Sequence, residues 1–131
     1  MIEKRYSDLK MVWHPEKMKD LLEGRVSEPP YVRVKPTNAC NYECVHCSYD
    51  PNTGDVGIHE DMLNRKDKIP REKMMEILSD FKDIGVKAVT YSGGGEPLIY
   101  PFILETLEKT IEYGIDLSII TNGQKLNGRA A

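Results

Sequence analysis

Segments of strand character alternate with segments of helix character along most of the chain, and this order limits the possible folds. Residues 31–35 alternate apolar and charged side chains, and residues 86–92 and 115–121 are short β-prone runs. The segments between them, 70–85 and 101–114, place apolar side chains three and four residues apart, as an amphipathic helix requires. Strands joined by helices pair in parallel through right-handed crossovers, so we predict an α/β fold.

Two further segments lie outside this alternation. Residues 1–30 are predicted to be a lead-in with a short helix that begins near Pro15 and ends at Gly24. Residues 31–131 are predicted to form the main domain. Within that domain, residues 50–68 are polar and rich in turn-forming residues, which indicates an irregular insertion.

Charge and cysteine positions exclude several classes of protein. The chain has 131 residues and a formal net charge of -3, so no global positive field attracts nucleic acid. No run reaches the roughly 18 apolar residues of a membrane span, and the N-terminus lacks the apolar stretch of a signal peptide. We therefore predict a cytoplasmic protein that binds neither nucleic acid nor membrane. All three cysteines fall within residues 40–47, too close together for a disulfide framework.

The cysteine segment carries three thiols on one short loop after the first predicted strand. Cys40, Cys44 and Cys47 are spaced as C-x-x-x-C-x-x-C. A closed zinc site takes four ligands and would need a histidine, either His46 between two of the cysteines or the remote His59. A four-iron four-sulfur cluster held by three cysteines instead keeps one iron free for a small molecule. Cys44 and Cys47 alone also match a C-x-x-C redox motif, so all three chemistries stay open.

A glycine-rich loop, residues 93–96, follows the second predicted strand. Glycines let a ligand approach the backbone closely, and the Glu96 carboxylate can accept hydrogen bonds from an ammonium group. The spacing matches neither a dinucleotide-binding fingerprint nor a phosphate-binding loop. Because adjacent parallel strands end at the same edge of a sheet, this loop and the cysteine segment are predicted to lie together.

In combination, the two motifs resemble those of the radical S-adenosylmethionine superfamily. The resemblance covers about residues 31–123, with the cysteines after the first strand, the glycine loop after the second, and a Thr-Asn-Gly ending after the third. The residues that carry it are Cys40, Asn41, Cys44, His46, Cys47, Gly94, Gly95, Glu96, Pro97, Thr121, Asn122 and Gly123.

The resemblance implies a four-iron four-sulfur cluster on Cys40, Cys44 and Cys47, whose free iron binds the amino and carboxylate groups of S-adenosylmethionine. It also implies reductive cleavage of this cofactor to a 5'-deoxyadenosyl radical, which abstracts hydrogen from a substrate. The cofactor-binding residues implied are Gly94, Gly95 and Glu96 for the methionine ammonium, His46 near the adenine, and Thr121 and Asn122 at the third strand.

Members of this family form a partial barrel, so residues 31–131 are expected to be the N-terminal half of a (β/α)6 TIM-like barrel that stops after its third strand. The resemblance implies an external electron donor such as flavodoxin or ferredoxin, and a partner chain is one way to supply the remaining strands. The substrate is unidentified, and similarity around the cysteines favours a peptide. A zinc-binding or thiol-redox module and a catalytically incompetent fragment are the alternative functions.

Overall fold

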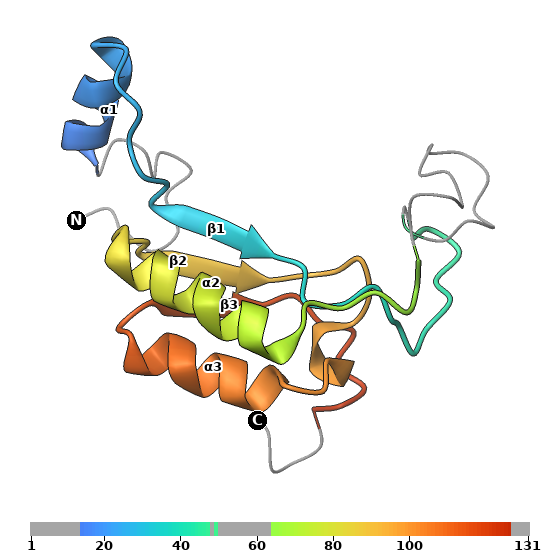
Figure 1. Ribbon diagram of the computed structural model, residues 1–131. Coiled ribbons are helices and arrows are strands. Elements are labelled where there is room, and N and C mark those ends of the chain that lie inside the picture. Colours follow the sequence, from blue (N-terminus) through green and yellow to red (C-terminus); the bar gives the residue numbers. More distant parts are fainter. Residues whose placement is uncertain (1–13, 48, 50–63, 127–131) are drawn as a thin grey trace, which may run out of the picture.

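The computed structural model describes residues 14–47, 49 and 64–126, which are built around a sheet of three parallel strands (Figure 1). The strands lie in the order β1–β2–β3, with bounds Tyr31–Val34, Ala88–Tyr91 and Asp116–Ile119. Each strand pairs in parallel with the next strand in the sequence. Val34, Tyr91 and Ile119 are aligned at the C-terminal end of the sheet. The α/β fold with parallel strands is therefore confirmed.

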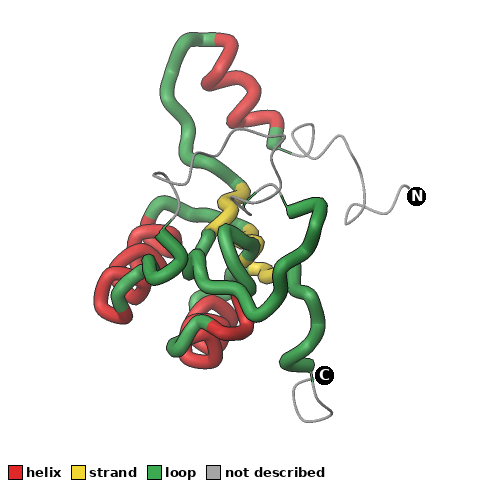
Figure 2. Tube along the Cα trace, turned by 90° about the vertical axis from the view of Figure 1, so that its right-hand side faces the viewer, coloured by secondary structure: helices red, strands yellow, loops and turns green. Residues whose placement is uncertain are grey.

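Two helices cover one face of this sheet (Figures 1 and 2). α2 (Arg71–Asp83) lies between β1 and β2 in the sequence, and α3 (Ile103–Glu112) lies between β2 and β3, preceded by the 3-10 helix η5 (Pro97–Ile99). The two α-helices also contact each other. Crossovers that return on the same side form one wall of a barrel, with helices outside and strand ends along one rim.

The face of the sheet that meets the helices carries the apolar core. Met74 and Leu78 of α2 are fully buried, as the helical spacing predicts, and Val89 of β2 packs in the same cluster. Tyr91 is also buried, and its hydroxyl lies 2.6 Å from the hydroxyl oxygen of Thr110 in α3. Burial raises the pKa of the Tyr91 phenol. The core residues are Val34, Met74, Leu78, Val86, Val89, Tyr91, Tyr100, Ile103 and Ile115.

The second and third strands are shorter than the β-prone runs that predicted them. Val86 and Ile115 belong to those runs, but their amides donate to carbonyls in the last turns of α2 and α3. Their side chains are buried in the core nonetheless. Each residue therefore closes the end of a helix before its strand begins, and apolar character alone does not mark a strand boundary.

Helix α1 (Pro15–Leu22) occupies the lead-in and extends away from the sheet (Figure 1). It has no buried residues, and Leu21 and Leu22 are exposed by 69% and 86%. Most of the predicted insertion, residues 50–63, lies outside the described residues, as does His59. None of the helices in the described ranges combines the length and the apolarity needed to cross a bilayer.

Candidate functional site

The cysteine loop, residues 40–47, starts from a base segment, residues 36–39, that is held on both sides. On one side, the amide of Asn38 donates to the carbonyl of Asp67 at 2.9 Å. On the other side, the amide of Glu96 donates to the carbonyl of Ala39 at 2.8 Å. These backbone hydrogen bonds fix the point from which the first cysteine emerges, directly beyond the end of β1.

The glycine loop, residues 93–96, packs directly on that base segment. A Cβ atom added to Gly95 would lie 1.7 Å from the carbonyl oxygen of Ala39, and one added to Gly94 would lie 2.3 Å from Oδ1 of Asn38. At Gly95 the backbone of the base segment occupies the place of a side chain, so a glycine is needed there to bring the two loops together. At Gly94 the nearest atom is the end of the Asn38 side chain, which would have to move to admit a side chain. The base segment therefore fills the space beside both glycines.

A tight turn places the second and third cysteines near each other. The amide of Cys47 donates to the carbonyl of Cys44 at 2.9 Å, which makes Val45 and His46 the central residues of the turn. Val45 is 88% exposed, and His46 is also exposed. Cys44 is exposed, while Cys40 and Cys47 are half-buried, and none of the three forms a disulfide.

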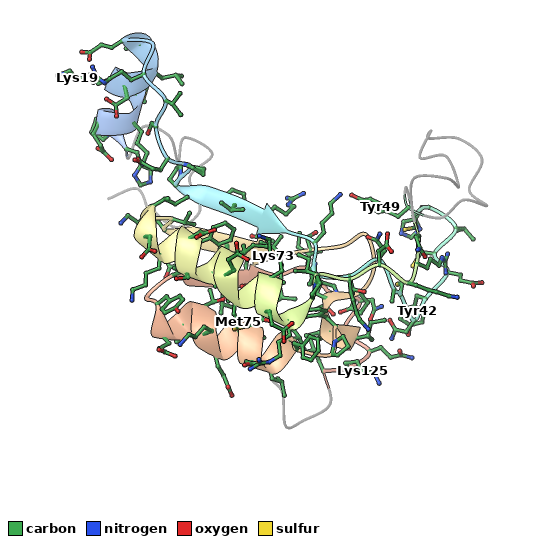
Figure 3. The ribbon with its side chains drawn as sticks, in the orientation of Figure 1. Lys19, Tyr42, Tyr49, Lys73, Met75 and Lys125 are labelled. Carbon is green, nitrogen blue, oxygen red and sulfur yellow. The ribbon has the colours of Figure 1, made fainter. Side chains whose placement is uncertain are left out.

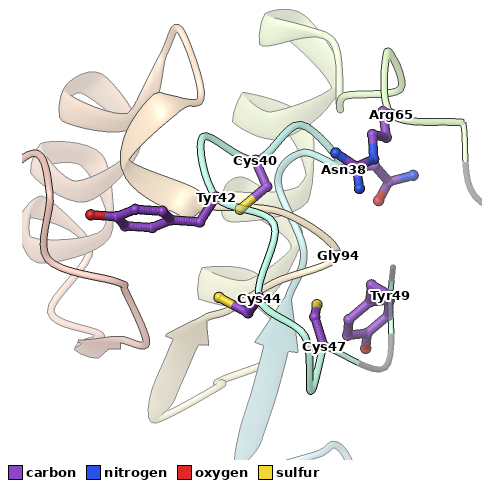
Figure 4. Close-up of a pocket in the computed structure, with 8 residues that line it drawn as sticks. All are labelled: Asn38, Cys40, Tyr42, Cys44, Cys47, Tyr49, Arg65 and Gly94. Carbon is purple, nitrogen blue, oxygen red and sulfur yellow. The ribbon is translucent and has the colours of Figure 1, made fainter. Parts of the chain in front are cut away.

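The three cysteines and Gly94 line one pocket at the C-terminal edge of the sheet (Figure 4). The cysteine motif and the glycine loop therefore meet, as the parallel topology predicts. The other residues that line this pocket are Asn38, Tyr42, Tyr49 and Arg65. Arg65 reaches the pocket from the segment before α2 and lies 3.9 Å from the carboxylate of Glu43. Arg65 thus adds one positively charged side chain to the lining of the pocket, with the Glu43 carboxylate near it.

The Glu96 carboxylate is buried and hydrogen-bonded within the chain. It is 3% exposed. Its Oε1 accepts from the amide of Leu98 at 2.9 Å and from the hydroxyl of Thr121 at 2.7 Å, and its Oε2 accepts from the amide of Asn122 at 2.8 Å. Three of its roughly four acceptor positions are therefore used inside the protein.

The loop after β3, residues 120–124, joins the cysteine loop through side-chain amides. Asn122 Nδ2 donates to Asn41 Oδ1 at 2.9 Å, and Asn41 Nδ2 donates to Gln124 Oε1. The amide of Gln124 in turn donates to Asn122 Oδ1 at 3.0 Å. The ends of all three strands are thereby connected through named hydrogen bonds.

The structure brings together most of the residues that the sequence singles out. The three cysteines and Gly94 line the pocket, and Glu96 is hydrogen-bonded to Thr121 and Asn122 beside it. His46 is exposed in its turn and does not line the pocket. Five residues of this region were not predicted from the sequence, namely Asn38, Tyr42, Tyr49, Arg65 and Gln124. Arg65 and Gln124 carried no sequence signal, because each reaches the cysteine loop from a distant segment.

The donor set suits an iron–sulfur cluster. Three thiols that line one pocket can provide one ligand for each of three irons, and they leave the fourth iron for a small molecule. Within residues 14–47, 49 and 64–126, no three His, Cys, Asp or Glu side chains are grouped closely enough to hold a single metal ion. The three cysteines therefore line the pocket without forming a site for a single metal ion.

Comparison with known proteins identifies the family. A model of the "Radical SAM superfamily" matches residues 34–131, which include both motifs and all three strand ends. The chain belongs to the radical SAM superfamily. Enzymes of this superfamily use a four-iron four-sulfur cluster and S-adenosylmethionine as cofactors.

Curated relatives include several GTP 3',8-cyclases. The chain is 33% identical to the enzyme of Tolumonas auensis over 92% of its own length, and this match covers 34% of that enzyme. It is 37% identical to the probable GTP 3',8-cyclase of Methanothermobacter thermautotrophicus over 76% of its length, covering 30% of that protein. The chain thus spans about a third of the length of these curated relatives.

Solved structures show the same fold. Streptococcus suis SuiB bound to the precursor peptide SuiA matches 99% of this chain with a TM-score of 0.64 and 23% identity, over 27% of its own chain. BtrN in complex with AdoMet and 2-DOIA matches 80% with a TM-score of 0.60 and 17% identity, over 41% of its chain. Both of those chains are longer than this one, so its three strands correspond to part of a larger fold.

Proposed function

We propose that this chain carries the cluster and S-adenosylmethionine site of a radical enzyme. Cys40, Cys44 and Cys47 would each bind one iron of a four-iron four-sulfur cluster. The chemistry that cluster and cofactor supply when bound is one-electron cleavage to methionine and a 5'-deoxyadenosyl radical, which takes a hydrogen atom from the substrate. The observation that supports this proposal most is the shared pocket of the three thiols and Gly94.

The chain's own residues would orient the cofactor at the strand ends. Backbone carbonyls around Gly94, Gly95 and Glu96 would accept hydrogen bonds from the methionine ammonium, because this loop borders the cysteine pocket through Gly94. Thr121 and Asn122 lie next to this loop through Glu96. His46, exposed on the cysteine turn, is proposed to contact the adenine after binding.

The proposal also covers the division of the chain, the electron donor and the strands that would complete the barrel. We propose residues 1–30 as a lead-in and residues 31–131 as the radical SAM portion, consistent with the lack of buried residues in α1. An external one-electron donor such as flavodoxin or ferredoxin would reduce the cluster, and a reducing compartment such as the cytoplasm would keep the thiols free. Further barrel strands, from this protein or a partner chain, would complete the substrate site.

The substrate has two candidate classes. The curated relatives are named for GTP, whereas one structural neighbour was solved with a precursor peptide. The peptide favoured by the sequence therefore stays a prediction, and a nucleotide is a second candidate. Both fit an enzyme that abstracts hydrogen from a substrate bound beside the strand ends.

Anaerobic reconstitution with iron and sulfide tests the cluster. We expect roughly four irons and four sulfides per chain, with the visible absorption of a four-iron cluster. Cys44→Ala should lose it, because two thiolates are too few to hold it stably. Val45→Ala changes an exposed neighbour in the same turn and should retain it. Uptake of one zinc and no iron would instead favour the zinc or thiol-redox module.

Addition of S-adenosylmethionine and a strong reductant then tests the radical chemistry. We expect 5'-deoxyadenosine from the reconstituted chain and none above background from Cys44→Ala, as measured by liquid chromatography. A chain that holds the cluster but forms no 5'-deoxyadenosine would support the alternative of a catalytically incompetent fragment.

A further inference from the structure

The residues before and after Cys40 are both connected to Glu96 by hydrogen bonds, one directly and the other through Asn122. The preceding residue, Ala39, accepts a hydrogen bond from the amide of Glu96 at 2.8 Å. The following residue, Asn41, accepts one from the Asn122 side chain at 2.9 Å. The backbone N–H of Asn122 donates in turn to Oε2 of Glu96 at 2.8 Å. One buried glutamate thus reaches both sides of Cys40.

The second of these connections is reinforced by a small group of side-chain amides, which we call the amide latch: Asn41, Asn122 and Gln124. Asn41 donates to Gln124 and accepts from Asn122, so both ends of its amide are used. Gln124 is oriented by its own backbone amide, which donates to Asn122 Oδ1 at 3.0 Å. A side chain held through both its donor and its acceptor group has a better-defined position than one held by a single hydrogen bond.

The anchor of the latch is protected from water. Glu96 is 3% exposed, and its oxygens accept from Leu98, Thr121 and Asn122. A buried carboxylate with three donors is held more firmly than an exposed one, because charge-assisted hydrogen bonds strengthen in a less polar environment. This carboxylate has little acceptor capacity left for a cofactor ammonium, and that role falls to the backbone carbonyls of the glycine loop.

We propose that Glu96 and the amide latch are positioning groups that fix Cys40 relative to the glycine loop. This inference rests on the proposed function, since Cys40 needs a fixed position only if it ligates a cluster. Cys44 and Cys47 lie beyond the latch on an exposed turn. Cys40 is accordingly the ligand whose position these hydrogen bonds with Glu96 and the amide latch would preset.

Iron release measures this role directly. The reconstituted chain is mixed anaerobically with an excess of a ferrous chelator, and the half-time of iron loss is compared between variants. Asn41→Ala removes both latch bonds, and we expect release about tenfold faster, the size expected for one or two lost hydrogen bonds. Asn41→Asp can accept from Asn122 and from a rotated Gln124 amide, and should stay within about threefold of the unmodified chain. Val45→Ala should match the unmodified chain.

A double-mutant cycle separates the latch from a general loss of stability. Gln124→Ala is expected to accelerate iron release in the unmodified chain but to add nothing in the Asn41→Ala background, because the two side chains act through one hydrogen bond. The electron paramagnetic resonance spectrum of the reduced cluster should change in Asn41→Ala and recover in Asn41→Asp. The melting temperature of the metal-free chain should stay nearly the same.

The outcomes distinguish this inference from the proposed function. If the unmodified chain holds no iron–sulfur cluster, the proposed function fails and the latch has no ligand to position. If the unmodified chain holds the cluster but Asn41→Ala releases iron no faster than Val45→Ala, the latch alone is wrong. Additive effects of Asn41→Ala and Gln124→Ala would also contradict it.

Discussion

The helix-covered face of the sheet and the rim at its C-terminal ends are built in different ways. The face is apolar, with Met74 and Leu78 fully excluded from water against Val89. The rim carries three cysteine thiols, and its loops are joined by directional hydrogen bonds centred on Glu96. Apolar burial is non-directional and provides most of the stability, whereas hydrogen bonds contribute little net free energy but define geometry.

This difference means that stability and ligand geometry should be separable by substitution. A core variant should change the free energy of unfolding without changing the chemistry of the rim. A rim variant should change metal binding more than it changes unfolding. Figure 3 shows the two regions, with Met75 on α2, Tyr42 within the cysteine loop and Tyr49 just beyond it.

The largest change in stability is expected for Leu78→Ala. Leu78 is fully buried between α2 and the sheet, so its truncation removes apolar contacts and leaves a cavity. We expect the free energy of unfolding to fall by roughly 2–5 kcal/mol, as measured by urea denaturation. Chains that remain folded should still bind iron, since Leu78 does not line the cysteine pocket.

Leu104→Ala is the matched control for this prediction. Leu104 lies in α3 but is 69% exposed. Its truncation should change the free energy of unfolding by no more than about 0.5 kcal/mol. Equal losses for the two leucine variants would show that α2 does not pack on the sheet as described.

The next largest effect is expected for Gly95→Ala, which should disturb the rim and the fold together. The new Cβ would lie 1.7 Å from the carbonyl oxygen of Ala39, so the glycine loop and the base of the cysteine loop must separate. We expect a loss of about 1–3 kcal/mol in the free energy of unfolding. Because the separation occurs next to Cys40, bound iron should fall by more than half, as measured by a colorimetric iron assay.

Gly114→Ala serves as the control for adding a methyl group to a glycine. Gly114 has a φ of +71° and nothing within 4 Å of an added Cβ, so its cost is backbone strain alone, about 1 kcal/mol. It ends α3 at the opposite end of the sheet and should leave iron binding unchanged. Full iron binding by Gly95→Ala would contradict the packing of the two loops.

The sequence was sufficient to predict the sheet and the meeting of its two motifs. Periodicity is a local property, and parallel topology places adjacent strand ends together without any knowledge of side-chain contacts. Cys40, Cys44, Cys47 and Gly94 could therefore be assigned to one edge before any coordinates were known, and they line one pocket.

The partners of the polar rim residues could not be predicted in this way. Glu96 bonds to residues 25 and 26 positions later in the chain, and Asn41 bonds to Gln124 across 83 positions. Such pairs depend on how two loops pack, which no periodicity encodes. The sequence predicts that the Glu96 carboxylate binds a ligand, and the structure adds that it is buried and hydrogen-bonded to Thr121 and Asn122.

The smallest effect is expected for Tyr91→Phe, which removes one hydroxyl from the core and nothing from the rim. The Tyr91 hydroxyl lies 2.6 Å from the hydroxyl oxygen of Thr110, which also donates to the carbonyl of Thr106 at 2.7 Å. Thr110 therefore keeps a partner in the variant. We expect a loss of about 1 kcal/mol at neutral pH, measured by urea denaturation, and unchanged iron binding.

The pH dependence of this difference identifies the buried phenol as its cause. Burial raises the pKa of Tyr91 in the folded chain above that of the unfolded chain, so its contribution is fully present at neutral pH and declines above about pH 10. The advantage over Tyr91→Phe should shrink there, because the unfolded chain gains stability by releasing the proton. A difference between the two proteins that stays constant from pH 7 to beyond about pH 10 would show that the phenol is accessible to water.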